Sequence, residues 1–327
     1  MVMDTGLWFY AAFTAFVLAM LAIDLGVFHR NAHAVRPKEA GAWVAVWTTL
    51  AISFAATLLF WKGAESALLF VTGYVIEQSL SIDNIFVIVM IFSYFRIPDK
   101  YQHRVLFWGI VGALLMRGLF IALGALLIRQ FSWIMYVFGA FLIFTGVKMA
   151  RRQDEAFDSE QNLVMRTARR FLRVTSEYHG QRFFTVQDGR RFATPLFLVL
   201  LLIEFADLVF AVDSIPAIFA VTTDPFIVYT SNVFAILGLR SMYFLLAGIV
   251  HRFAYLKYGL ALILTFVGCK MVVIDIVHVS IPISLGVIVV TLSLSIAASM
   301  LYPPKAGDLI HKTQEKTGSI FGSEGSG

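Results

Sequence analysis

The chain has 327 residues, of which 59% are hydrophobic and 14% are charged, and it carries a formal net charge of +5 at pH 7. Soluble domains contain roughly 25% charged residues, so this composition excludes an ordinary soluble domain and indicates a polytopic membrane protein. The basic residues fall in several loops and form no continuous stripe, so nucleic acid is not expected as a partner. The single cysteine, Cys269, excludes a disulfide framework within the chain.

Nine apolar segments are long enough to be transmembrane helices. The predicted spans are residues 7–28, 41–61, 67–94, 105–128, 131–150, 194–220, 226–250, 254–275 and 281–301. The first lacks a basic leader and a clear cleavage site, so we interpret it as a retained helix and not as a signal peptide. With the N-terminus outside, most Lys and Arg residues of the loops lie in the cytoplasm, and the positive-inside rule therefore predicts an N-out, C-in orientation.

We expect six regions along the chain. They are two N-terminal transmembrane helices (1–66), a first three-helix repeat (67–150), a basic cytoplasmic connector (151–193), a second three-helix repeat (194–275), the last transmembrane helix (276–302) and a disordered cytoplasmic tail (303–327). The connector is expected to contain a basic amphipathic helix and a turn at Gln187-Asp188-Gly189. Its expected role is to enforce the topology, and a regulatory role is left open.

The two repeats are visible when the fifth and eighth spans are aligned. YVFGAFLIFTGVKM (136–149) then matches YGLALILTFVGCKM (258–271), and Arg117 of the fourth span falls over Arg240 of the seventh. In the third and sixth spans Glu77, Asp83 and Asn84 fall over Asp207, Asp213 and Ser214. Because each repeat has three spans, the two copies must be inverted in the membrane, and inverted repeats with a polar site at their interface are typical of transporters.

Two acidic segments, VIEQSLSIDNIF (75–86) and IEFADLVFAVDSIP (203–216), interrupt otherwise apolar spans. They contain the five carboxylates Glu77, Asp83, Glu204, Asp207 and Asp213. A carboxylate at the middle of the bilayer costs roughly 2.5 to 3.5 kcal/mol on insertion scales, so five of them predict a function. Residues six apart lie about 120° apart on a straight helix, and we therefore expect both helices to be broken or kinked near Asp83 and Asp213.

These carboxylates, with Asn84 and Ser214 as neutral oxygen donors, form a set of hard ligands. No His or Cys lies deep inside a span, so the set suits Mn²⁺, Ca²⁺ or Mg²⁺ and disfavours Cu(I) and Zn²⁺. Two alternatives remain: buried salt bridges of the acids with Arg117 and Arg240, and a proton relay without metal. In the metal hypothesis the two arginines balance the charge of the acids when the metal leaves.

The acidic motifs resemble those of the TerC family of integral membrane proteins, and most of all its Alx-type members. The segments that carry the resemblance are GYVIEQSLSIDNIFV, YVFGAFLIFTGVKM and LLIEFADLVFAVDSIPAIFAVTTDPFIVYTSNVFAILGLRSMYFLLAG. The resemblance implies a bacterial inner-membrane protein linked to manganese export, with associations to tellurite resistance and alkaline pH. It implies a site at Glu77, Asp83, Glu204, Asp207 and Asp213, with Asn84 and Ser214 adjoining.

We therefore expect an all-α, multi-pass transporter that exports Mn²⁺ from the cytoplasm, with no catalytic residues and no resident cofactor. Exchange of the metal for protons is a natural coupling, since clustered acids bind both. The alternatives are a non-transporting membrane binding or regulatory protein of the tellurite-resistance type, and an exporter of another hard cation such as Ca²⁺. An intramembrane enzyme is disfavoured. The oligomeric state is left open.

Overall fold

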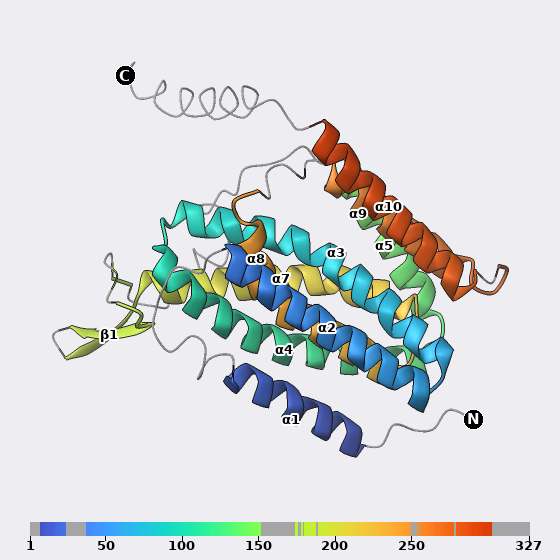
Figure 1. The fold of residues 1–327 in the computed structure, drawn as a ribbon, viewed down its shortest axis with the longest axis horizontal. Helices are drawn as coiled ribbons and strands as arrows, with labels where there is room; N and C mark the ends of the chain where they lie inside the picture. The colour runs from blue at the N-terminus through green and yellow to red at the C-terminus, as the bar shows by residue number, and fades with distance from the viewer. Residues whose placement is uncertain are drawn as a thin grey trace.

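In the computed structural model, the part of the chain that is described forms nine α-helices and one β-hairpin (Figure 1). The described residues are 7–23, 37–151, 174–175, 178, 180–187, 189–249, 253, 255–277 and 279–302. The helices are α1 (Leu7–Ile23), α2 (Pro37–Trp61), α3 (Ala64–Tyr94), α4 (Asp99–Gln130), α5 (Ile134–Arg151), α7 (Pro195–Phe219), α8 (Pro225–Leu246), α9 (Leu256–Val272) and α10 (Ile281–Leu301). The expected all-α class is confirmed. Residues 152–173 of the connector, which include the expected amphipathic helix, and the tail after residue 302 lie outside the described residues.

Six of the described helices are long and apolar enough to cross a membrane, namely α2, α3, α4, α5, α7 and α10, and α1 contains a shorter apolar stretch. The helix α8 does not meet that criterion because it carries Thr230, Ser231, Asn232 and Arg240 along its length. All four side chains are buried by neighbouring helices, so α8 is surrounded by protein and has little contact with lipid. The count of nine spans stays a prediction.

Helices α2, α3, α4 and α7 are arranged around α8 (Figure 1). Helices α3, α4 and α7 pack together with α8 at the centre, and α2 covers α3 and α8. Helix α1 lies at one edge of the molecule, where Phe13 packs against Phe226 and Phe234 of α8. Helices α5, α9 and α10 form a second group at the opposite edge, joined to the first by contacts of α10 with α3 and of α5 with α7.

The packing of α5 on α9 follows the alignment of the two expected repeats. With Tyr136 set over Tyr258, Gly146 corresponds to Gly268, and Ala261 and Thr265 correspond to Gly139 and Ile143. A Cβ on Gly146 would meet Ala261 and Thr265, and a Cβ on Gly268 would meet Gly139 and Ile143. In addition, α3 packs on α8 as α4 packs on α7. A twofold relation would produce this exchange of contacts, and the inverted repeat stays a prediction.

The expected breaks in the acidic helices are wrong. Helix α3 is continuous from Ala64 to Tyr94 through Asp83, and α7 is continuous from Pro195 to Phe219 through Asp213. A break within the hydrocarbon region would leave backbone polar groups unpaired at several kcal/mol each, which favours the continuous helix. Pro216 is tolerated because it lies in the last turn of α7, close to the end of the helix.

A β-hairpin extends from the end of the bundle at which α7 begins (Figure 1). Strand β1 (Phe184–Gln187) pairs antiparallel with β2 (Arg190–Ala193), and Gly189 adopts a φ of 72° in the turn expected there. The hydroxyl of Tyr178 donates a hydrogen bond to the carbonyl of Phe95 at 2.6 Å, in the connection between α3 and α4. The second half of the connector is thereby attached to the end of the bundle where α3 ends and α4 begins.

Candidate functional site

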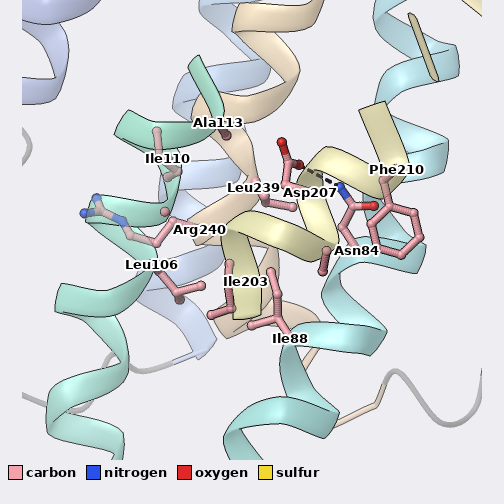
Figure 2. Close-up of a pocket in the computed structure, with 12 residues that line it drawn as sticks. Asn84, Ile88, Leu106, Ile110, Ala113, Ile203, Asp207, Phe210, Leu239 and Arg240 are labelled. Atoms are coloured by element: carbon pink, nitrogen blue, oxygen red, sulfur yellow. Dashed lines mark hydrogen bonds between the residues drawn. The ribbon is translucent and has the colours of Figure 1, made fainter. Parts of the chain in front are cut away.

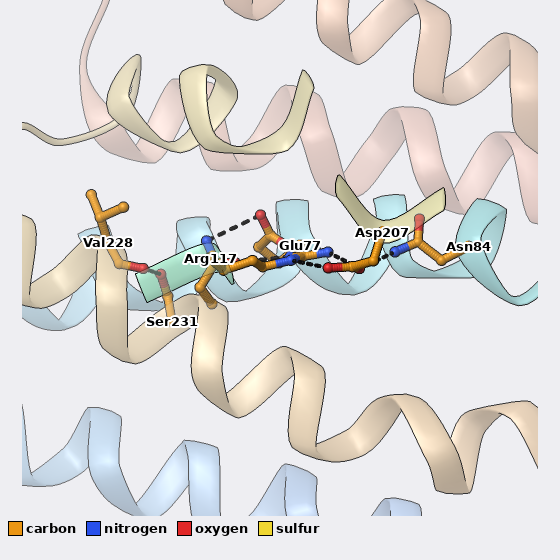
Figure 3. Close-up of polar contacts among 7 residues, drawn as sticks. Glu77, Asn84, Arg117, Asp207, Val228 and Ser231 are labelled. Carbon is orange, nitrogen blue, oxygen red and sulfur yellow. Dashed lines mark hydrogen bonds and ion pairs between the residues drawn. The ribbon is translucent and has the colours of Figure 1, made fainter. Parts of the chain in front are cut away.

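Five polar side chains from four helices meet inside the bundle. They are Glu77 and Asn84 of α3, Arg117 of α4, Asp207 of α7 and Asn232 of α8, and none of them is more than 7% exposed. Figure 3 shows Arg117 between Glu77 and Asp207, with Asn84 on the far side of Asp207. Glu77 and Asn84 are seven residues apart, so a continuous α3 presents both on the same face.

Arg117 is the centre of this network. Its Nη2 and Nε donate to the Asp207 carboxylate at 2.9 and 3.3 Å, and its Nη1 donates to Oε2 of Glu77 and to Oδ1 of Asn232. The amide of Asn232 in turn donates to Oε1 of Glu77 at 3.2 Å, and the amide of Asn84 donates to Oδ1 of Asp207 at 3.3 Å. The side-chain amide nitrogens of both asparagines therefore donate to carboxylates, and these hydrogen bonds fix the positions of the acids.

The network carries one net negative charge, because two carboxylates share one guanidinium. Burying charges is costly, and it is repaid only when the geometry of the pair is good and the remaining polar atoms are hydrogen-bonded. The planar guanidinium meets this requirement, since it can bind two acids at once with directed N–H groups. The salt bridges expected as one alternative reading of the acids are thus present for Glu77 and Asp207.

Several buried side-chain oxygens of α3 and α7 are unpaired, and one of them, in Asn84, belongs to this network. Five buried side-chain polar atoms of the described residues have no hydrogen-bond partner, and three of these belong to residues of the expected ligand set. They are Oδ1 of Asn84, Oε2 of Glu204 and Oγ of Ser214. Gly112 of α4 makes room for Glu204, since a Cβ at this position would overlap the Glu204 carboxylate. Buried oxygens without donors are rare in native proteins, and they are suitable ligands for a hard cation.

A cavity of about 20 Å³ lies beside the network (Figure 2). Asn84 and Asp207 line it at one side, and Leu106 and Arg240 line it nearer to the turn between α3 and α4, with the Arg240 guanidinium pointing away from Asp207. A cavity of this size holds about one water molecule. A hydrated cation therefore has no room in this cavity in the present conformation.

The structure does not bring all of the expected ligands together. Glu204 lies three residues before Asp207 on α7, while Asp83 and Asp213 are only partly buried. Asp213 is directed at α5, where Thr145 and Lys148 lie near its carboxylate. Among the described residues, no three His, Cys, Asp or Glu side chains are grouped so that they could hold a metal ion. Glu77, Asn84 and Asp207 are thus the members of the set that meet.

Two further residues of this region carry polar contacts outside the expected ligand set. Asn232 of α8 bonds to Arg117 and to Glu77. His103 is buried and its Nε2 lies 3.2 Å from Nη1 of Arg240. The sequence placed His103 before the fourth span, but α4 begins at Asp99 and includes it. A hydropathy argument misses such a residue because the first turn of α4 is polar.

Comparison with known proteins agrees with this architecture. The family described as integral membrane protein TerC family matches residues 62–306. The chain is 57% identical over 297 residues to an uncharacterized membrane protein, STKORF319, of Myxococcus xanthus, covering 90% of this chain and 92% of the relative. It is 52% identical over 291 residues to the putative membrane-bound redox modulator Alx of Escherichia coli (strain K12), covering 85% and 90%. No solved structure matches the chain. The protein belongs to the TerC family of integral membrane proteins.

Proposed function

We propose that this protein is a multi-pass transporter of the bacterial inner membrane that exports Mn²⁺ from the cytoplasm, in exchange for protons. The observation that carries the proposal is the buried pair of carboxylates, Glu77 and Asp207, which share a single cationic group beside the unpaired oxygen of Asn84. Carboxylate, amide and hydroxyl oxygens are the ligands of hard divalent cations. An intramembrane acid also marks an ion pathway by default.

The position of the cavity supports loading from the cytoplasm. It extends from Asn84 and Asp207 toward Leu106, which lies in the second turn of α4. The N-out, C-in orientation expected from the loop charges places the turn between α3 and α4 in the cytoplasm. A cation that enters from this side reaches Asp207 and Asn84 first and Glu77 later, which is the direction that export requires.

The second candidate is a non-transporting membrane protein of a regulatory kind. The name of the Escherichia coli relative, a putative membrane-bound redox modulator, favours this class, and so does the saturation of Arg117 by two carboxylates, which suffices for a purely structural role. A thiol-based redox role would need a partner, because Cys269 is the single cysteine of the chain and cannot form an intrachain disulfide. Ca²⁺ is the main alternative cargo, since it prefers the same oxygen ligands.

The test is Mn²⁺ export at matched expression, in cells and in inverted vesicles, for the wild type, Glu77→Gln and Asp207→Asn. We expect the wild type to lower cellular Mn²⁺, and both variants to fail while remaining inserted. Glu65→Gln is the matched control, because Glu65 is an exposed acid in the first turn of α3. Transport by both variants at the wild-type rate would assign the acids to structure, and a wild type that moves no Mn²⁺ would move the assignment to Ca²⁺ or to the regulatory class.

Proton exchange has its own test. Protons compete with the metal for carboxylates, so an imposed pH gradient should drive Mn²⁺ into inverted vesicles in which the membrane potential is clamped with an ionophore. The expected rate falls when the gradient is collapsed. A rate that is indifferent to the gradient would contradict the coupling and leave export itself intact.

A further inference from the structure

We infer that Arg117 is an internal substitute for the exported cation: its guanidinium and the divalent metal compete for the carboxylates of Glu77 and Asp207. This inference rests on the proposed function and adds a role to its site. It makes Arg117 a positioning residue that closes the site between transport events. It also explains why a hard-ligand set and a fully paired salt bridge coincide in the same place.

The first step of the argument is geometric. Arg117 is 2% exposed and contacts both acids with three of its nitrogens, so each of the two carboxylates has at least one oxygen directed at the guanidinium. A metal ligated by the same two carboxylates has to lie between them, which is the place that the guanidinium occupies. Metal and guanidinium therefore cannot both hold these oxygens.

The second step concerns charge. Two carboxylates with Arg117 carry one net negative charge, and the same two carboxylates with a divalent metal and no guanidinium are neutral. With metal and guanidinium together the group would carry a net positive charge in a buried region, where like charges repel strongly. Metal binding is thus coupled to the departure of Arg117, and metal release is coupled to its return.

The third step is that the surrounding atoms fit a site with two occupants. Asn232 accepts from Arg117 with Oδ1 at 2.8 Å and donates to Glu77, so it holds the acid in place whichever cation is bound. Asn84 donates to Asp207 but leaves its Oδ1 unpaired. A guanidinium can only donate and does not use this oxygen, whereas a metal can accept an electron pair from it.

The inference predicts an opposite effect on binding and on transport. In Arg117→Met, which keeps a long unbranched side chain and removes the charge, the two carboxylates lose their competitor. We expect Mn²⁺ to bind the purified full-length protein at least about tenfold more tightly, and Mn²⁺ export from proteoliposomes to fall at least about tenfold, because nothing displaces the bound ion. Binding is measured by equilibrium dialysis and by the Mn²⁺-dependent rise of the melting temperature.

Three further variants define the interpretation. Arg117→Lys keeps the charge and should bind Mn²⁺ within about threefold of wild type while export is slowed, because an ammonium cannot bridge two acids as a guanidinium does. The double variant Glu77→Gln with Arg117→Met retains one net negative charge but only one carboxylate, and should show no tightening. Arg129→Met, an exposed change near the end of the same helix, should behave as wild type.

The outcomes separate this inference from the proposed function. If Arg117→Met exports Mn²⁺ at the wild-type rate and binds it no more tightly than the wild type does, the role of Arg117 is overturned and the proposed transport function stands. A wild type that neither binds nor exports Mn²⁺ or Ca²⁺ overturns the proposed function. If Arg117→Met folds only when Mn²⁺ is present during expression, the metal has replaced the guanidinium as inferred. If it stays unfolded with Mn²⁺ while Arg117→Lys folds, Arg117 is purely structural.

Discussion

The guanidinium of Arg117 donates to both oxygens of Asp207, from Nη2 to Oδ1 at 2.9 Å and from Nε to Oδ2 at 3.3 Å. This two-point contact joins α4 to α7, and both side chains are withdrawn from solvent. A bidentate arginine–carboxylate pair fixes orientation as well as distance. The relative rotation of the two helices is therefore set by this pair together with the packing around it.

Asp207→Asn tests this pair. The amide keeps the volume of the side chain but loses the negative charge, and it can no longer accept from two nitrogens of Arg117. We expect the free energy of unfolding to fall by about 3 kcal/mol, since removal of one partner leaves part of a buried charge uncompensated. The measurement is denaturant titration in mixed micelles, with Glu65→Gln expected within about 0.5 kcal/mol of wild type. Equal stabilities of the two variants would contradict the role given to the pair.

Asn232→Leu tests the neutral member of the network. The change removes the acceptor of one Arg117 hydrogen bond at 2.8 Å and the donor to Glu77 at 3.2 Å. We expect a loss of about 2 kcal/mol, because buried polar groups on both sides lose a partner. Ser231→Ala is the matched control, since the Ser231 hydroxyl donates to the Val228 carbonyl of its own helix, and the change should cost less than about 1 kcal/mol. Thermal denaturation of the two variants side by side is the measurement, and an equal loss of stability in both would contradict the role given to Asn232.

The sequence predicted the helices well because apolar length is a strong signal. The third span was expected at 67–94 and α3 covers Ala64–Tyr94. The fourth was expected at 105–128, but α4 covers Asp99–Gln130, because its first turn is polar and lies beyond the reach of a hydropathy argument. His103 is in this turn, so its burial beside Arg240 could not be predicted.

The site was predicted in composition and not in arrangement. The cost of buried acids identified Glu77 and Asp207, but which of five acids meet depends on the rotation of each helix about its own axis, and packing partners far apart in sequence determine that rotation. The expected breaks followed from the assumption that all five acids share one point. The long side chain of Arg117 removes that need, since it reaches both acids from α4.

Gly268→Ala tests the packing of the second helix group. The new Cβ would lie 2.7 Å from the Gly139 carbonyl oxygen and 2.9 Å from the Ile143 nitrogen, which are backbone atoms and cannot move aside. We expect a loss of about 1 to 3 kcal/mol. Gly286→Ala in α10 is the control: it has nothing within 4 Å and should be neutral or stabilising by up to about 1 kcal/mol.

Gly146→Ala extends this test to the repeat. If a twofold axis relates α5 and α9, Gly146 and Gly268 are equivalent, and the Cβ of Gly146→Ala would likewise meet a carbonyl oxygen, that of Ala261, at 2.7 Å. The two alanine variants should then lose the same free energy of unfolding to within about 0.5 kcal/mol, as judged from their melting temperatures. A neutral Gly146→Ala beside a destabilised Gly268→Ala would contradict the twofold relation.

The attachment of the hairpin to the bundle should depend on pH. Burial raises the pKa of the Tyr178 phenol above its ordinary value, and the neutral phenol donates to the Phe95 carbonyl at 2.6 Å. Since the folded state holds the proton more tightly, the stabilisation is complete below the ordinary pKa of about 10 and is lost as the pH rises through the raised pKa. Tyr178→Phe should cost about 1 kcal/mol at neutral pH, and its difference from wild type should shrink at the highest pH. The measurement is the melting temperature of the wild type and of Tyr178→Phe from neutral to high pH, with tyrosinate absorbance as a direct titration of the phenol. A difference in melting temperature that stays constant with pH would exclude the Tyr178 hydrogen bond as the attachment.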